Sequence, residues 1–234
     1  MELRDALADA ASEWYRRSGI FARHFARGKL GWDPAYIGIL ERGLIADSGR
    51  LLDLGCGQGL MAAWLLAARA RCESGRWPQR VPEPPRIGAF TGIELMRSDV
   101  ERARHAFGDR ARFIGGDIRT VAFEPADTAI ILDVLHYMTF EEQATVLERV
   151  RNALTPSRGT LLLRIGDASG GLRFDISRWV DHAVTFLRGH RLLKLYCRSL
   201  AEWQSTLRSL GFSVETMPMS RGTPFANVLL VAKL

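Results

Sequence analysis

Residues 51–59 read Leu-Leu-Asp-Leu-Gly-Cys-Gly-Gln-Gly and run without a break into the apolar segment 60–70. A short apolar strand that ends in alternating glycines and continues as a helix brings its backbone close to a ligand. A Cβ atom at Gly55 or Gly57 would obstruct that approach and restrict the turn. We therefore predict a strand, a turn and a helix here, with a nucleoside cofactor bound at the turn.

The spacing of the glycines separates this turn from the dinucleotide-binding type. The dinucleotide fingerprint is Gly-x-Gly-x-x-Gly, whereas the glycines here fall at 55, 57 and 59 and residue 60 is Leu. Asp53 lies two residues before the first glycine. A carboxylate is unfavourable beside a pyrophosphate but suits a ligand that carries an ammonium group and a sulfonium. The pattern therefore disfavours an NAD oxidoreductase.

The same residues resemble motif I of the class I S-adenosylmethionine-dependent methyltransferases. The usual form of that motif is an acidic residue, one apolar residue and Gly-x-Gly-x-Gly. The resemblance implies S-adenosylmethionine as cofactor and methyl transfer as the activity. It also implies that the cofactor contacts this loop, at Asp53, Gly55, Cys56, Gly57 and Gly59.

Glu94 is the candidate ligand for the cofactor's ribose. In nucleotide-binding α/β units, an acidic residue after the second strand accepts hydrogen bonds from the ribose about 20 residues after the last glycine. Glu94 follows the predicted strand 87–93 but lies 35 residues after Gly59. The segment 72–86 contains four prolines and is predicted to be a surface insertion; without it the spacing is 20 residues. We expect Glu94 and the adjacent Leu95 to contact the cofactor.

A Gly-Asp-apolar step at 116–118 follows the predicted strand 112–114. It resembles the family's adenine site, which implies that Asp117 accepts a hydrogen bond from the exocyclic amine and that Ile118 covers the ring. The alternative is that Asp117 only caps the following helix.

The apolar, β-branched run 128–132 predicts a central parallel strand. Ligands of open parallel sheets bind beyond the carboxyl ends of the strands, so Asp133 and His136 are expected near the transferable methyl group. We predict Asp133 to be a cofactor contact. His136 is the candidate general base, because histidine ordinarily titrates near neutral pH. A place in the pocket wall beside Tyr137 is an equal alternative.

The order of predicted elements indicates an α/β fold. It is Rossmann-like, with a seven-stranded, mostly parallel sheet, one antiparallel edge strand, and helices on both faces. Residues 1–46 are predicted to form an N-terminal helical cap, and residues 47–234 the cofactor-binding domain, with a lid insertion at 166–198. Together they are expected to form one structural domain.

The predicted lid suggests an acceptor. Residues 175–187 have helical amphipathic spacing, and Trp179 and Phe186 are candidates for the pocket wall. Basic side chains around them outnumber the acidic ones: Arg164, Arg173, Arg178, Arg188, Arg191, Lys194 and Arg198. Such a rim suits an aromatic or acyl acceptor with an acidic group, with delivery on an acyl carrier protein as one option. Segments 179–203 and 223–227 resemble methyltransferases of bacterial aryl-polyene pigment pathways, which implies secondary metabolism and carrier-bound aryl intermediates.

Composition limits the remaining alternatives. The chain has 234 residues, 47% of them apolar and 25% charged, as in a soluble globular protein. Its three cysteines lack metal-ligand spacing, so we expect no metal site and a reduced, cytoplasmic compartment. No apolar run approaches the ~20 residues that span a bilayer. The net charge of +6 keeps an RNA methyltransferase open, but the basic residues are scattered among acidic ones, so nucleic acid is disfavoured. A non-catalytic S-adenosylmethionine-binding protein is the other alternative.

Overall fold

The computed structural model describes residues 2–166, 195–219 and 227–234. The predicted helix at 175–187, with Trp179 and Phe186, lies outside the described residues. So do Arg173, Arg178, Arg188, Arg191 and Lys194 of the predicted basic rim.

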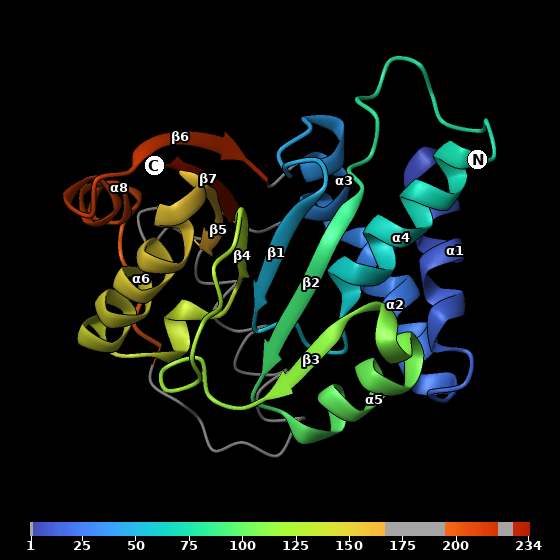
Figure 1. Cartoon of the computed structure of the whole chain (residues 1–234), viewed down its shortest axis with the longest axis horizontal. Coiled ribbons are helices and arrows are strands. Elements are labelled where there is room, and N and C mark those ends of the chain that lie inside the picture. The colour runs from blue at the N-terminus through green and yellow to red at the C-terminus, as the bar shows by residue number, and fades with distance from the viewer. Residues whose placement is uncertain (1, 167–194, 220–226) are drawn as a thin grey trace.

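One seven-stranded sheet forms the centre of the molecule, with the order β3-β2-β1-β4-β5-β7-β6 (Figure 1). Neighbours from β3 to β5 pair in parallel, and β7 pairs antiparallel with both β5 and β6. The predicted mostly parallel sheet is confirmed, and its antiparallel member lies next to the edge strand β6. The strands are β1 (Gly49–Leu54), β2 (Ile87–Glu94), β3 (Arg112–Gly115), β4 (Thr128–Leu132), β5 (Thr160–Gly166), β6 (Ser213–Pro218) and β7 (Asn227–Lys233).

Helices cover both faces of the sheet, as Figure 1 shows. One face packs against α1 (Leu3–Ser12), α2 (Ile20–Trp32), α3 (Pro34–Glu41), α4 (Leu60–Glu73) and α5 (Arg97–Phe107). The other packs against α6 (Phe140–Leu154) and α8 (Leu200–Ser209). Short 3₁₀ turns lie at η1 (Glu13–Tyr15), η2 (Gly108–Arg110), η3 (Leu135–Tyr137) and η4 (Thr155–Ser157).

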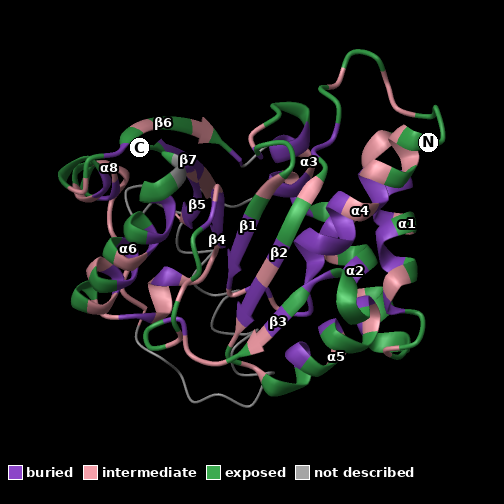
Figure 2. Cartoon of the chain, viewed as in Figure 1, coloured by how far each residue is buried: buried purple, intermediate pink, exposed green. Residues whose placement is uncertain are grey.

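The alternation of side chains along each strand divides the apolar residues between two cores. In β1, Leu51 belongs to the core beneath α1–α5, whereas Leu52 and Leu54 belong to the core beneath α6 and α8. Figure 2 shows the buried residues gathered on the strands and on the inner faces of the helices. By the same alternation, Asp53 in β1 and Arg164 in β5 lie on the face covered by the N-terminal helices.

The N-terminal helices share a core with α4 and α5. Trp64 Nε1 donates a hydrogen bond to the Tyr36 carbonyl over 3.0 Å, and Gln58 Nε2 donates to the Ala22 carbonyl over 2.8 Å. The Trp14 ring stacks on the Phe107 ring with 5.4 Å between centroids. These contacts support our proposal that residues 1–46 are a cap on the same structural domain.

One helix boundary differs from the prediction. Helix α4 extends to Glu73, so the proline-rich irregular segment begins at 74 rather than 72.

Within the described ranges, we find no helix with the length and apolar character needed to cross a lipid bilayer.

Candidate functional site

The glycine loop lies between β1 and α4, at the carboxyl edge of the sheet. Gly55, Gly57 and Gly59 all adopt left-handed backbone conformations, with φ of 75°, 54° and 83°. The amides of Gly55 and Cys56 donate to the Ile93 carbonyl over 2.8 and 3.2 Å. These bonds join the loop to the end of β2, so the turn is held by the neighbouring strand.

The three glycines differ in what a Cβ atom would meet. A Cβ atom on Gly55 would lie 2.3 Å from Cγ2 of Val134, and one on Gly59 would lie 2.8 Å from the ring of Phe113. A Cβ on Gly57 would meet no atom of the described residues within 4 Å. Gly55 and Gly59 are therefore packed against the protein, whereas Gly57 faces open space that a ligand can enter.

Asp53 is a buried carboxylate on the strand that leads into this loop, with 5% of its surface exposed. Among the residues that the structure describes, no donor or cation is paired with it. Burial, with a smaller contribution from the Glu94 charge, raises the pKa of Asp53 from its ordinary value of 3.8 to about 7. An uncompensated buried carboxylate costs folding free energy, so its presence here indicates a cationic ligand.

Glu94 and Cys56 border the same space. The two Glu94 oxygens accept hydrogen bonds from the amides of Gly57 and Met96, over 2.9 and 2.8 Å. A carboxylate has about four acceptor sites, so two further hydrogen bonds can be accepted. The Cys56 thiol is buried, and burial together with the Asp53 charge raises its pKa, which keeps it neutral. Leu95 is 63% exposed beside Glu94.

The predicted adenine-site residues differ in their environments. Arg119 donates through Nε and its terminal nitrogen to Asp117, and through its other terminal nitrogen to Glu142 over 2.6 Å. These bonds lower the pKa of the Asp117 carboxyl. Ile118 is only 4% exposed and belongs to the core beneath α6. A hollow of about 470 Å³ lies nearby, lined by Leu95, Arg97, Val100, Glu101, Arg104, Gly115 and Gly116. Of the apolar candidates, Leu95 is the more accessible to a ligand.

Asp133 lies in an ion cluster at the ends of β4 and β5. Arg164 Nε donates to Asp133 over 2.8 Å, and its two terminal nitrogens donate to Asp133 and to Asp33. The Lys29 ammonium is 2.9 Å from Asp33 and 4.0 Å from Asp133. Burial alone would raise the pKa of Asp33, but the charges of Arg164 and Lys29 hold it well below its ordinary value. The Asp133 carboxylate is thus directed to Arg164.

His136 lies in η3, directly after the Asp133 turn, and is partly buried. Its ring centroid is 4.2 Å from that of Tyr137, and its carbonyl accepts a hydrogen bond from the Tyr196 amide over 2.8 Å. The second contact joins the described end of the predicted lid segment to the loop after β4. Both predicted roles, base and pocket wall, remain open at this position.

Arg164 was predicted to belong to an exposed basic rim, and this prediction is wrong. Its side chain is only 2% exposed, because it lies within the ion cluster rather than on the surface. Arg198 donates to Gln143 Oε1 over 2.9 Å and to the Phe140 carbonyl over 3.1 Å. Both side chains are thus occupied by contacts within the protein.

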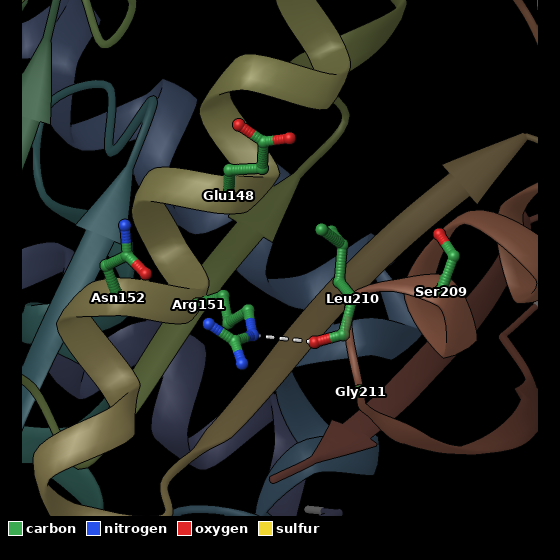
Figure 3. Close-up of a pocket in the computed structure, with 6 residues that line it drawn as sticks. All are labelled: Glu148, Arg151, Asn152, Ser209, Leu210 and Gly211. Atoms are coloured by element: carbon green, nitrogen blue, oxygen red, sulfur yellow. Dashed lines mark hydrogen bonds between the residues drawn. The ribbon is translucent and has the colours of Figure 1, made fainter.

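A second hollow, of about 450 Å³, lies between the last turns of α6 and α8 (Figure 3). Its lining includes Glu148, Asn152 and Arg151, whose Nε donates to the Leu210 carbonyl over 2.7 Å. Helices α6 and α8 both end here, and the chain then enters β5 after α6 and β6 after α8. The hollow therefore lies at the amino edge of the sheet. It is therefore separate from the glycine loop.

Several site residues were missed at the level of sequence. Arg164 interrupts an apolar strand, and a charged residue within a buried strand requires a partner. Asp33-Pro34 is a helix-start signal, and the Asp33 carboxylate accepts from the Ala35 amide over 3.0 Å. Tyr15 gives no signal beyond an ordinary apolar pattern. It is fully buried, and no atom of the described residues pairs with its hydroxyl.

Comparison with known proteins finds a methyltransferase domain in this chain. Residues 52–161 match the family model described as a methyltransferase domain. The carboxy-S-adenosyl-L-methionine synthase of Chromohalobacter salexigens is 32% identical over 141 residues, which cover 56% of this chain and 47% of that protein. The chain thus spans about half the length of this curated relative.

Solved structures share the fold over nearly the whole chain. The mitomycin 7-O-methyltransferase MmcR matches with a TM-score of 0.63 and 20% identity, covering 98% of this chain and 61% of that one. The magnesium protoporphyrin IX methyltransferase ChlM of Synechocystis PCC 6803, solved with bound SAH, matches with a TM-score of 0.59 and 18% identity, covering 99% and 97%. The family match over residues 52–161 and the shared fold bear out the resemblance seen in residues 51–59, and the chain contains a methyltransferase domain with the fold of S-adenosylmethionine-dependent methyltransferases.

Proposed function

We propose that this protein transfers a methyl group from S-adenosylmethionine to a small-molecule acceptor. The observation that carries the proposal is Asp53, a buried carboxylate with no partner among the described residues, next to a left-handed glycine loop. The cofactor's ammonium and sulfonium charges would supply the missing cation. An electrically neutral or anionic nucleoside ligand would leave the Asp53 charge uncompensated.

The other loop residues fit the remaining parts of this cofactor. Gly57 leaves open space for close approach, and Glu94 retains acceptor sites for the two ribose hydroxyls. Asp117 can accept from the adenine amine with the acceptor sites that Arg119 does not use. Leu95, rather than the buried Ile118, offers apolar surface to the adenine ring. S-adenosylmethionine, when bound, supplies an already activated methyl group.

What remains for the protein is to orient the acceptor and exclude water. Orientation alone can supply roughly 7–11 kcal/mol of the barrier. The acceptor is proposed to bind beyond β4, where His136 can remove a proton from a hydroxyl or ring carbon. That role for His136 rests on its position directly after the Asp133 turn.

The acceptor itself is proposed to be an aromatic or acyl compound. The methyltransferase structures that share the fold include enzymes named for small molecules, such as mitomycin and magnesium protoporphyrin IX. Delivery on a carrier protein remains a prediction, because Arg164 and Arg198 do not form a free basic rim and the other rim residues lie outside the described ranges.

Isothermal titration calorimetry tests the cofactor assignment. We expect S-adenosylmethionine and S-adenosylhomocysteine to bind with micromolar affinity, about −8 kcal/mol, and NAD not to bind. NAD binding without S-adenosylhomocysteine binding would overturn the proposal. Labelled cofactor incubated with small-molecule, carrier-protein and RNA fractions then identifies the acceptor, and the product's mass shows whether a single methyl group has been added. Cofactor binding without transfer to any fraction would favour the non-catalytic alternative.

His136→Ala should lower turnover by about tenfold or more while leaving cofactor affinity unchanged, because a general base typically contributes 10²–10⁴ in rate. Turnover and calorimetry should be measured across pH. His105→Ala, a change in the exposed last turn of α5, is the control. If turnover of the His136 variant equals that of the wild type at every pH, His136 belongs to the pocket wall.

A further inference from the structure

The buried ion cluster does more than neutralise charges, because it joins three separate parts of the chain. Arg164 comes from β5, Asp133 follows β4, and Asp33 caps the start of α3. Arg164 uses Nε and both terminal nitrogens in these bonds. The planar guanidinium presents its donors in a fixed fork, so it sets the direction of the Asp133 and Asp33 carboxylates together.

Asp133 needs this restraint because its backbone is in a left-handed conformation, with φ of 59°. A non-glycine residue persists in that region when its surroundings over-determine it, and such residues cluster at functional sites. Arg164 pairs in register with Leu132, the residue immediately before Asp133. The arginine is therefore in the right place to hold the turn from the adjacent strand.

The turn is in direct contact with the glycine loop. Val134 fills the space that a Cβ on Gly55 would occupy, at 2.3 Å from its Cγ2 atom. His136 and Tyr137 follow in η3, where the Tyr137 and Met138 amides donate to the Val134 and Leu135 carbonyls, over 3.2 and 3.0 Å. A shift of Asp133 would therefore displace the His136 segment, whereas the glycine loop is also held by the bonds of the Gly55 and Cys56 amides to the Ile93 carbonyl.

The cluster is poorly explained by stability alone. Arg164 and Asp33 are almost completely buried, and the desolvation of buried ion pairs often cancels their attraction. Well-packed apolar residues of similar size often serve stability equally well. Retaining four charged groups here is consistent with a requirement for exact placement.

We propose that Arg164 is a positioning residue, which holds the turn at Asp133 against the glycine loop and ties it to α3 through Asp33. The effect on catalysis rests on the proposed methyl transfer, whereas the effect on the conformation of the turn does not. All three guanidinium nitrogens of Arg164 donate within the cluster, so we assign it no contact with acceptor or cofactor.

The test uses two variants and a matched control. The double variant Arg164→Met with Asp33→Asn removes one buried positive charge and one buried negative charge. The partly exposed Asp133 carboxylate then keeps Lys29 as a nearby cation. Arg164→Lys keeps the charge but lacks the fork. Arg50→Met combined with Asp127→Asn removes a more exposed forked pair, with bonds of 3.1 and 3.0 Å, at the opposite edge of the sheet.

Hydrogen exchange measures the position of the turn without any need for activity. We expect the Tyr137 and Met138 amides to exchange about tenfold faster in both Arg164 variants, because local opening becomes easier. The Arg50 control should leave these amides unchanged. Wild-type exchange at Tyr137 and Met138 in a folded Arg164→Lys or double variant would overturn the proposal.

Kinetics tests the consequence for the reaction. Small misplacements can cost about 10² in rate, so the Arg164 variants should lose most of their kcat while the Kd of S-adenosylhomocysteine changes much less. A double variant with wild-type kcat would limit Arg164 to a structural role and overturn the proposal. If the wild type neither binds the cofactor nor transfers methyl, the proposed function fails, and the exchange data still decide whether Arg164 positions the turn.

Discussion

Gly57→Ala should weaken S-adenosylmethionine binding by about 10- to 100-fold, the scale of placing one extra carbon in a close-packed contact. The reason is that the new Cβ would enter the open side of the loop, where no atom of the described residues lies within 4 Å. Stability should fall by only about 1–2 kcal/mol, which is the cost of a Cβ in the left-handed region. Calorimetry with S-adenosylhomocysteine and denaturant unfolding measure the two effects.

Gly75→Ala is the matched control for this prediction. Gly75 has a left-handed φ of 71°, compared with 54° for Gly57, and a Cβ there would also meet no atom within 4 Å. Its position in the irregular segment after α4 lies outside the loop. The two variants should therefore lose similar stability, while only Gly57→Ala loses affinity. Equal affinities in the two variants would show that the cofactor does not approach the loop at Gly57.

Asp53→Asn should stabilise the free protein at pH 8 and weaken cofactor binding. The folded state raises the pKa of Asp53 from 3.8 to about 7, so the folded protein binds an extra proton between these values. Its free energy of unfolding therefore decreases as pH rises from about 4 to 7, then levels off. At 1.36 kcal/mol per pKa unit, the penalty above pH 7 reaches up to about 4 kcal/mol, and Asn removes most of it.

Binding should show the opposite dependence, since a cationic ligand favours the ionised carboxylate. Wild-type affinity is expected to decrease below pH 7, with proton release on binding that calorimetry in buffers of different ionisation enthalpy can detect. Asp53→Asn should bind about 10- to 100-fold more weakly, because hydrogen bonds to charged groups are worth about 1.5–3 kcal/mol. Asp99→Asn, which removes a buried carboxylate paired with Arg102 at 2.7 Å, should give no stabilisation. Loss of stability in Asp53→Asn at pH 8 would contradict the assignment of Asp53 as an uncompensated charge.

Much of the fold was predictable because its signals are local. Uninterrupted apolar runs such as 128–132 marked the strands, and Thr139 with Glu142 forms a capping box that is itself a local signal for the start of α6. The predicted boundary at 72 was wrong because α4 continues through Cys72 and Glu73 and ends at Ser74 and the left-handed Gly75, before the first proline. The place of β7 between β5 and β6 depends on pairing between distant strands, which local patterns do not specify.

The order of glycines and the acidic residue before them predicted the turn and its place as a cofactor loop, because left-handed turns and close approach require glycine itself. The same residues could not reveal that Asp53 has no partner among the described residues, since pairing depends on which side chains the N-terminal helices bring to that face. Arg164 shows the difference most clearly. In the sequence it is one basic residue among several beside a predicted lid, and it was assigned to an exposed rim. The folded chain places it between Asp33 and Asp133, residues 131 and 31 positions away, and the attraction among buried charges there sets the conformation of the turn beside the cofactor loop.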